Sequence, residues 1–255
     1  MSVPADPVCT FLVFTEDGSK GAVSTLEALT KKLLRYIDPS CETHRIRFEP
    51  GNDEAREILT ANQFKNPRHG RRFQLYRYVA TQLTIENRFI IHHVDADRTW
   101  NSRSSNPSEN AAAIQRDLID HVRKVLHERF SDEEIDRRLS RFFRLVPYWE
   151  IEAWLYQNTG PALSFCKKRP DCRCGALLAA WKADRGLLDE EPDPSDLLCF
   201  GKHHNEALVQ GFPTAEAYAA GKSLAAAVDA MFACDALLHA IERTYQPPTV
   251  EAPSA

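Results

Sequence analysis

The sequence predicts an α/β fold in which a mostly parallel, Rossmann-like sheet is flanked by helices and followed by a helical C-terminal extension. Between residues 8 and 158, short β-prone runs alternate with stretches whose apolar residues recur at helical spacing. Strands that alternate with helices form parallel sheets that are covered on both faces. The chain has 255 residues, of which 43% are hydrophobic, so it can bury a substantial core.

The first half of this region is predicted to contain two strands and two helices. VCTFLVF (8–14) is β-prone and ends in the loop formers TEDGSKG, after which residues 24–37 have helical periodicity. HRIRFEP (44–50) alternates and stops at Pro50, and residues 71–84 form the second predicted helix.

The second half repeats this unit. NRFIIHHV (87–94) is predicted to be the third strand, and a helical pattern runs from about 109 to 129. RFFRLVP (141–147) is the fourth predicted strand, and WEIEAWLYQN (149–158) is predicted to be a helix. In such sheets, ligands bind where the loops converge at the carboxyl ends of the strands.

The remaining residues are predicted to form a smaller, mostly helical part, so that residues 1–158 are the α/β domain and 159–245 an insertion with a helical cap. Residues 159–198 are interpreted as an insertion or linker with a short helix at ALLAAWKADRG, and residues 224–245 as an amphipathic helical cap on the sheet. The Pro-containing residues 246–255 are expected to be a flexible tail.

Charge and composition give no global argument for a nucleic-acid or membrane partner. The net charge is −4 and the pI is about 6.2. No segment has the roughly 18 consecutive apolar residues of a membrane span, and the N-terminus lacks a secretory signal pattern. We therefore expect a cytoplasmic protein without a membrane partner, in which the seven cysteines are thiols or metal ligands rather than disulfides.

Acidic residues follow three of the four predicted strands. Glu16 follows the first, Asp95 and Asp97 follow the third, and Glu150 and Glu152 follow the fourth. Because the carboxyl ends of parallel strands meet at one edge, these side chains are expected to converge there. Carboxylate oxygens are the ligands that Mg²⁺ prefers, although an Asp-x-Asp pair after a strand is also common in turns.

This arrangement of acids resembles the TOPRIM domain, the metal-binding fold of topoisomerases, primases and OLD-type nucleases. TEDGSKG, HHVDADRTW and VPYWEIEAWL are most similar to a small bacterial group that is found beside ATPases and is associated with defence against phage. The resemblance implies a nuclease in which Glu16 is a general acid or base or a metal ligand, Asp95 and Asp97 hold Mg²⁺ or Mn²⁺, and Glu150 or Glu152 completes the site. It departs from the family pattern at Asp17, which stands before Gly18 and leaves open whether Glu16 or Asp17 enters the site.

Two details of the predicted site depend on local geometry. In a helix over 149–158, Glu150 and Glu152 cannot face the same way, so Glu152 is the preferred inner residue and Glu150 a helix-start acid. His92 and His93 lie inside a predicted strand and therefore point to opposite faces. We expect them to pack in the core or to contact a metal ligand.

Basic residues near the predicted edge are candidates for nucleic-acid binding. The segment KNPRHGRRFQLYR (65–77) interleaves basic and aromatic side chains, which can bind phosphates and stack bases, although a solvated loop fits the same pattern. The candidates are Lys20, Lys65, Arg68, Arg71, Arg72 and Arg98.

The chain has no G-x-x-x-x-G-K-[ST] loop, so a separate ATPase is the expected partner of a nuclease effector. A homo-oligomer is also compatible with the sequence. The alternatives to a nuclease are a non-catalytic adaptor that keeps the fold and a metal-dependent phosphohydrolase of small molecules.

The cysteines in the second half of the chain suggest a structural Zn²⁺ site. Cys166, Cys172, Cys174 and Cys199, with His203 and His204, contain enough ligands for tetrahedral Zn²⁺. The C-x5-C-x-C spacing is not that of a standard zinc knuckle, and partly buried reduced thiols are the alternative.

Overall fold

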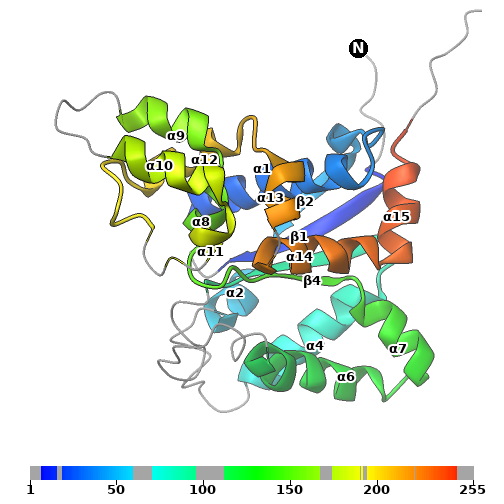
Figure 1. Cartoon of the computed structure of the whole chain (residues 1–255). Helices are drawn as coiled ribbons and strands as arrows, with labels where there is room; N and C mark the ends of the chain where they lie inside the picture. Colours follow the sequence, from blue (N-terminus) through cyan, green and yellow to red (C-terminus); the bar gives the residue numbers. More distant parts are fainter. Residues whose placement is uncertain are drawn as a thin grey trace, which may run out of the picture.

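A four-stranded parallel sheet forms the centre of the molecule (Figure 1). The computed structural model describes residues 7–15, 19–59, 71–95, 112–166, 174–189, 191, 194–220 and 222–245. The strand order is β2-β1-β3-β4, and all neighbouring pairs are parallel. The strands are β1 (Cys9–Thr15), β2 (Ile46–Pro50), β3 (Arg88–His93) and β4 (Phe142–Leu145). The predicted α/β fold with a parallel sheet flanked by helices is confirmed.

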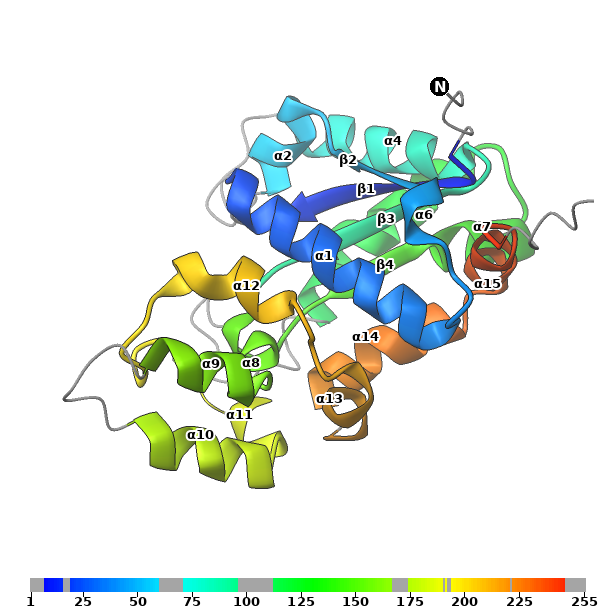
Figure 2. The ribbon, with the colours of Figure 1, turned by 90° about the horizontal axis from the view of Figure 1, so that it is seen from above.

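One face of the sheet shares a buried cluster with the first helix and the helices that follow β4 (Figure 2). These helices are α1 (Lys20–Ile37), α8 (Glu152–Leu155), α9 (Thr159–Cys166), α10 (Cys174–Ala183), α11 (Gly186–Asp189), α12 (Asn205–Val209), α13 (Thr214–Ala220), α14 (Lys222–Phe232) and α15 (Asp235–Glu242). Short 3₁₀ turns, η1 (Thr43–Arg45) and η3 (Lys202–His204), precede β2 and α12.

The opposite face packs against the helices that lie between β2 and β4 in the sequence. They are α2 (Asp53–Leu59), α4 (Arg71–Thr84), the π-helical turn η2 (Gln115–Ile119), α6 (Asp120–Leu126) and α7 (Asp132–Leu139). In Figure 1, α4, α6 and α7 lie on the side of the sheet away from α1.

Side chains alternate between these two faces along each strand. In β1, Phe11 and Val13 belong to the α1 side, whereas Leu12 and Phe14 belong to the α4 side. Successive residues of a strand point to opposite faces, and a strand that is covered on both faces is apolar throughout. This explains why the segment that forms β1 is an apolar run with little polar alternation.

A row of four phenylalanines crosses the sheet on the α1 side, one from each strand. The ring centroids of Phe48 and Phe11 are 5.3 Å apart, those of Phe11 and Phe89 are 5.1 Å apart, and those of Phe89 and Phe143 are 6.1 Å apart. Aromatic pairs at such distances add to the free energy of burial. The row fixes how the four strands lie beside one another under the helices.

The strand order places a ligand crevice at one point of the sheet. The chain leaves β1 toward β2 on one side and then returns past β1 to form β3 on the other side. The connections after β1 and β3 therefore diverge, and sheets of this type bind ligands outside the carboxyl ends of the two strands concerned.

Several predicted helices differ from the observed ones. The helix predicted over 149–158 is only the single turn α8, and the helix predicted over 109–129 contains the π-helical turn η2 and ends at Leu126. The helix predicted over 224–245 is broken into α14 and α15, because Ala233 and Cys234 interrupt it and Cys234 caps the second helix in an extended conformation. The described part of 159–198 forms helices whose apolar residues join the cluster on the α1 side, so of the two interpretations it agrees with a packed insertion and not with a linker.

Within the described ranges, no single helix is long and apolar enough to cross a membrane. The pair α14 and α15 meets the length and composition criteria only when taken together, and the two are bent by 74°.

Candidate functional site

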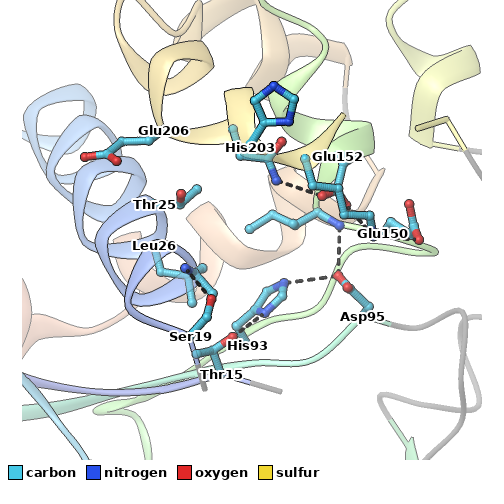
Figure 3. A pocket seen from close by; sticks show the side chains of 15 residues that line it. Thr15, Ser19, Thr25, Leu26, His93, Asp95, Glu150, Glu152, His203 and Glu206 are labelled. Carbon is cyan, nitrogen blue, oxygen red and sulfur yellow. Dashed lines mark hydrogen bonds and ion pairs between the residues drawn. The ribbon is translucent and has the colours of Figure 1, made fainter. Parts of the chain in front are cut away.

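A cavity of about 540 Å³ lies at the carboxyl ends of β1 and β3. Its walls come from the end of each strand, the first turns of α1, residues 150–152 after β4, and the segment from η3 to α12 (Figure 3). This is the crevice that the strand order predicts. The volume is within the usual range of small-molecule sites.

A histidine at the end of β3 connects the two central strands across the base of the cavity. The Nδ1 atom of His93 is 3.3 Å from the Thr15 hydroxyl, and its Nε2 atom is 3.2 Å from Oδ1 of Asp95 (Figure 3). His93 is buried, so these two contacts fix the orientation of its ring. Asp95 can hold a proton on Nε2, which leaves Nδ1 to accept a hydrogen bond from Thr15.

Asp95 is held by two groups that favour its charged form. Its Oδ1 atom accepts a hydrogen bond of 2.8 Å from the backbone N–H of Ile151, in addition to the contact with His93. Burial by itself would raise the pKa of Asp95, but the His93 imidazole and the Ile151 N–H bring this pKa below its ordinary value. Asp95 is therefore a carboxylate at neutral pH.

Two buried glutamates face one lysine on the other side of the cavity. The Lys202 ammonium is 3.0 Å from Oε1 of Glu150 and 3.7 Å from Oε2 of Glu152. Glu150 also accepts a hydrogen bond of 3.1 Å from the Ser195 hydroxyl, and Glu152 accepts one of 2.7 Å from the Asn205 side-chain amide. Lys202 is 54% exposed, whereas the Glu152 side chain is 2% exposed.

The charges in this cluster influence one another. Burial raises the pKa of Glu152, and the nearby Asp95 carboxylate adds to this effect, while Asn205 opposes it. Burial would lower the pKa of Lys202, but the two glutamates hold it above its ordinary value. Within the described part of the chain, Oε2 of Glu152 accepts no hydrogen bond, so this buried oxygen is available to a cation.

Three of the predicted acids therefore line one cavity. Asp95, Glu150 and Glu152 come together as their positions after β3 and β4 predict. Glu16, Asp17 and Asp97 lie outside the described residues, although Thr15, directly before Glu16, lines the same cavity.

The prediction that Glu150 and Glu152 face different ways is wrong. Both line the cavity and both contact Lys202. The spacing rule for helices does not apply, because α8 begins only at Glu152 and Glu150 precedes it in a non-helical conformation.

The predicted basic residues are only partly described. Lys65, Arg68 and Arg98 lie outside the described residues. Lys20 is exposed as the first residue of α1, and Arg72 lies in the first turn of α4. Arg71 binds the carboxylate of Glu57 in α2 at 2.5 Å, so part of its charge is neutralised.

We compared the chain with known proteins. No family model, no curated protein and no solved structure matches it. The chemistry of the site therefore has to be argued from its own residues.

Several residues of the site are absent from the sequence-based predictions. Lys202 and Asn205 come from a segment about fifty residues after the glutamates that they contact, where the sequence carries no recognisable motif.

The two predicted histidines lie on opposite faces of the sheet. His93, which is predicted to pack in the core or to contact a metal ligand, contacts Asp95. As predicted, His92 points to the opposite face, where its ring lies 5.9 Å from that of Phe142.

A second group of potential ligands lies apart from the carboxylates. Potential ligand atoms of Cys166, Cys174 and Cys199 all lie within 4.8 Å of one another. Among the described residues, this is the one group of three or more His, Cys, Asp or Glu side chains with ligand atoms this close together. The oxygens of the three carboxylates around Lys202 are therefore more widely spaced than these sulfurs. Cys172 lies outside the described residues.

The arrangement around the cavity combines elements used in phosphoryl chemistry. Carboxylates lie opposite the N-terminus of α1, whose residues Ser19, Gly21 and Ala22 line the cavity. A helix N-terminus attracts phosphate oxygens, and carboxylates attract divalent cations. An oriented histidine between them can transfer a proton.

Proposed function

We propose that this chain is a cytoplasmic, Mg²⁺- or Mn²⁺-dependent hydrolase of phosphodiester bonds, with DNA or RNA as its substrate. The observation that supports the proposal is the convergence of Asp95, Glu150 and Glu152 at the carboxyl edge of the sheet, in the same cavity as the N-terminus of α1. The resemblance of the acid pattern to TOPRIM nucleases, which rests on the same acids, agrees with it.

The chemistry of these carboxylates suits a divalent cation, and their oxygens, which are more widely spaced than the cysteine sulfurs, would draw together around it. The buried Oε2 atom of Glu152 accepts no hydrogen bond within the described ranges, and Asp95 is charged at neutral pH. These two residues, with Glu150, would hold the cation. A bound cation supplies charge that polarises a phosphoryl oxygen and lowers the pKa of a bound water.

Lys202 acts as the counterion of the glutamates in the absence of a divalent cation. Its side chain is half-exposed, so it can withdraw toward solvent, whereas the buried glutamates cannot. Once withdrawn, its ammonium group is at the mouth of the cavity and can bind a non-bridging phosphate oxygen. The position of Lys202 thus differs between the two states: it contacts the glutamates without substrate and the phosphate when substrate is bound.

His93 and the first turn of α1 position the reacting groups. Asp95 and Thr15 occupy both ring nitrogens of His93, so the imidazole takes part in proton transfer through the Thr15 hydroxyl, which gives its proton to Nδ1 as it accepts one from the attacking water. The backbone N–H groups at the start of α1 receive the phosphate. Lys20 and Arg72, at the first turns of α1 and α4, extend the positive charge along the same edge for a longer nucleic acid.

The test measures hydrolysis of plasmid DNA, single-stranded RNA and bis-p-nitrophenyl phosphate with Mg²⁺, with Mn²⁺ and with EDTA. Asp95→Asn and Glu152→Gln should each reduce cation-dependent hydrolysis at least about 100-fold, because each removes a charge from the cation. Glu133→Gln, which changes an exposed glutamate of α7, should keep full activity. A wild-type protein that is inactive on all three substrates, alone and with a candidate partner ATPase, would contradict the proposal.

The size of the cavity supports a second candidate, a phosphohydrolase of small phosphorylated molecules. A cavity of about 540 Å³ can hold a nucleotide-sized ligand without a long polymer. Release of inorganic phosphate from nucleotides or sugar phosphates, without cleavage of plasmid or RNA, would favour this candidate. A chain that hydrolyses none of these substrates but binds a separate ATPase would instead be an adaptor.

A further inference from the structure

Three cysteines from separate segments meet beside the candidate site. Cys166 is the last residue of α9, Cys174 is the first residue of α10, and Cys199 lies three residues before Lys202. Their potential ligand atoms, the sulfurs, all lie within 4.8 Å of one another. In a tetrahedral zinc site with Zn–S bonds of about 2.3 Å, sulfur atoms are roughly 3.8 Å apart, so a small adjustment would bring these three to that spacing.

Two features direct positive partial charge toward the Cys174 sulfur. The backbone N–H of Cys199 donates a hydrogen bond of 3.3 Å to this sulfur. The sulfur also lies at the N-terminus of the ten-residue helix α10, where the helix dipole stabilises negative charge. The same sulfur lies 3.9 Å from the carbonyl oxygen of Leu197.

The alternative role of these cysteines is to fill the core as small apolar side chains. Cys9, Cys41 and Cys234 are buried elsewhere, outside any such group within the described ranges, and serve in that way. Core packing does not require three sulfurs to converge, nor a backbone N–H directed at one of them. Metal binding requires the convergence, and an N–H group directed at a ligand sulfur is typical of the surroundings of a bound metal.

We propose that Cys166, Cys174 and Cys199 bind one Zn²⁺ as three thiolate ligands, with the fourth position taken by a ligand outside this set. Thiolates are soft ligands that select zinc over Mg²⁺, so this ion is distinct from the cation of the carboxylate site. Three thiolates and one Zn²⁺ carry a net charge of −1. The Cys199 N–H and the N-terminus of α10 offset part of that charge.

The zinc would hold the segment that carries Lys202. Phe200 follows Cys199 directly and packs edge-on against Tyr156 and Phe165, with ring centroids 5.3 Å and 5.7 Å away. Lys202 follows two residues later and contacts the two glutamates. Zinc bound to Cys199 thus fixes one end of a short segment whose other end enters the cavity. This inference concerns metal content and stability and does not depend on the proposed hydrolase activity.

Elemental analysis of the purified full chain provides the first test. The protein is prepared with a phosphine reductant and without chelator, and we expect about one zinc ion per chain. Replacement of zinc by Co²⁺ should give the intense visible bands of tetrahedral cobalt and a sulfur-to-cobalt charge-transfer band in the near ultraviolet. A wild-type protein with less than about a tenth of an equivalent of zinc and no such cobalt spectrum would overturn the proposal.

Single substitutions identify the ligands. Cys174→Ala and Cys199→Ala should lose the zinc and the charge-transfer band, whereas Cys234→Ala, a matched change at another buried cysteine, should keep both. Zinc that persists in Cys199→Ala but disappears in Glu152→Gln would assign the ion to the carboxylates and overturn the proposal. If the cysteine variants fail to fold, the cobalt spectrum of the wild-type chain decides, since only thiolate ligands produce the charge-transfer band.

Discussion

The ammonium group of Lys202 lies 3.7 Å from a buried oxygen of Glu152 that accepts no hydrogen bond within the described part of the chain. The same ammonium lies 3.0 Å from Glu150. A single positive charge therefore faces two buried carboxylates. A divalent cation would balance the two negative charges, whereas the single charge of Lys202 does not.

Replacing Lys202 by methionine should make the chain dependent on divalent cations for stability. The change leaves two buried carboxylates without their ammonium partner and should lower the free energy of unfolding by about 1–2 kcal/mol in EDTA, less than for a fully buried pair because Lys202 is half-exposed. Millimolar Mn²⁺ should recover most of this loss, because it takes the place of the lysine charge. Thermal unfolding in EDTA and in Mn²⁺ measures both effects.

Lys182→Met is the matched control, since Lys182 is an exposed lysine of α10. It should change the melting temperature little in either buffer. Equal Mn²⁺ responses in Lys202→Met and Lys182→Met would show that the cation does not bind at the glutamates.

Asp95→Asn should destabilise the protein at neutral pH and have a smaller effect in acid. The pKa of Asp95 is below its ordinary value of 3.8 in the folded chain. The charged carboxylate therefore stabilises the folded state above about pH 4, and this contribution is lost as the pH falls through the folded pKa. Asparagine keeps an oxygen for the Ile151 N–H, so the variant isolates the charge.

Urea unfolding at pH 7, 5, 4 and 3 measures this difference. We expect a loss of about 1–2 kcal/mol at pH 7 that shrinks at the lowest pH. A difference that stays constant over the whole range would mean that the charge of Asp95 contributes nothing.

Glu152→Gln should separate stability from activity. Burial holds the pKa of Glu152 above its ordinary value, so its charged form weakens the folded state as the pH rises through that pKa. Glutamine keeps an oxygen for the Asn205 amide and removes the buried charge. In EDTA at pH 7 the variant should be as stable as the wild type or more stable by up to about 1 kcal/mol, while hydrolysis is lost.

The comparison at pH 4 completes this test. Below the ordinary pKa of glutamate the wild-type side chain is itself neutral, so the two proteins should unfold at the same urea concentration. A variant that is strongly destabilised at pH 7 would show instead that the charged pair with Lys202 stabilises the fold.

Ser223→Ala should destabilise the packing of α8 against the C-terminal helices. The Ser223 hydroxyl accepts a hydrogen bond of 2.7 Å from the indole N–H of Trp154 and donates one to the buried carboxylate of Asp189. Alanine leaves both buried groups without this partner, which should cost about 2–3 kcal/mol in urea unfolding. Ser164→Ala, at an exposed serine of α9, should change the free energy of unfolding by less than about 0.5 kcal/mol.

The strands and the acidic edge of the sheet were predictable because each depends on local sequence. Apolar runs identify strands that are buried on both faces, and parallel strands bring their carboxyl ends together wherever the chain alternates with helices. That logic places Asp95 and Glu152 in one region without any knowledge of packing.

Other features were missed for different reasons. The helix α7 begins with a capping box formed by Ser131 and Glu134, a local signal that hydrophobic periodicity does not include. Lys202 and Asn205 carry no such signal, because their contacts with the glutamates depend on how short helices pack after β4. The orientation of Glu150 was mistaken because the start of a short helix is difficult to predict to within two residues.

The central position of β1 and β3 determines which parts of the cavity can move. Each of these strands has a hydrogen-bonded neighbour on both sides, so its amide hydrogens should exchange with deuterium only when most of the sheet opens. His93 ends β3 with partners in both β1 and β4, and Thr15 ends β1 paired with His93. Lys202 and Asn205 instead lie in short turns and helices that open locally at a smaller cost in free energy. The wall of the cavity that the strand ends form therefore opens only rarely, whereas the wall that carries Lys202 and Asn205 can change its conformation when a ligand binds.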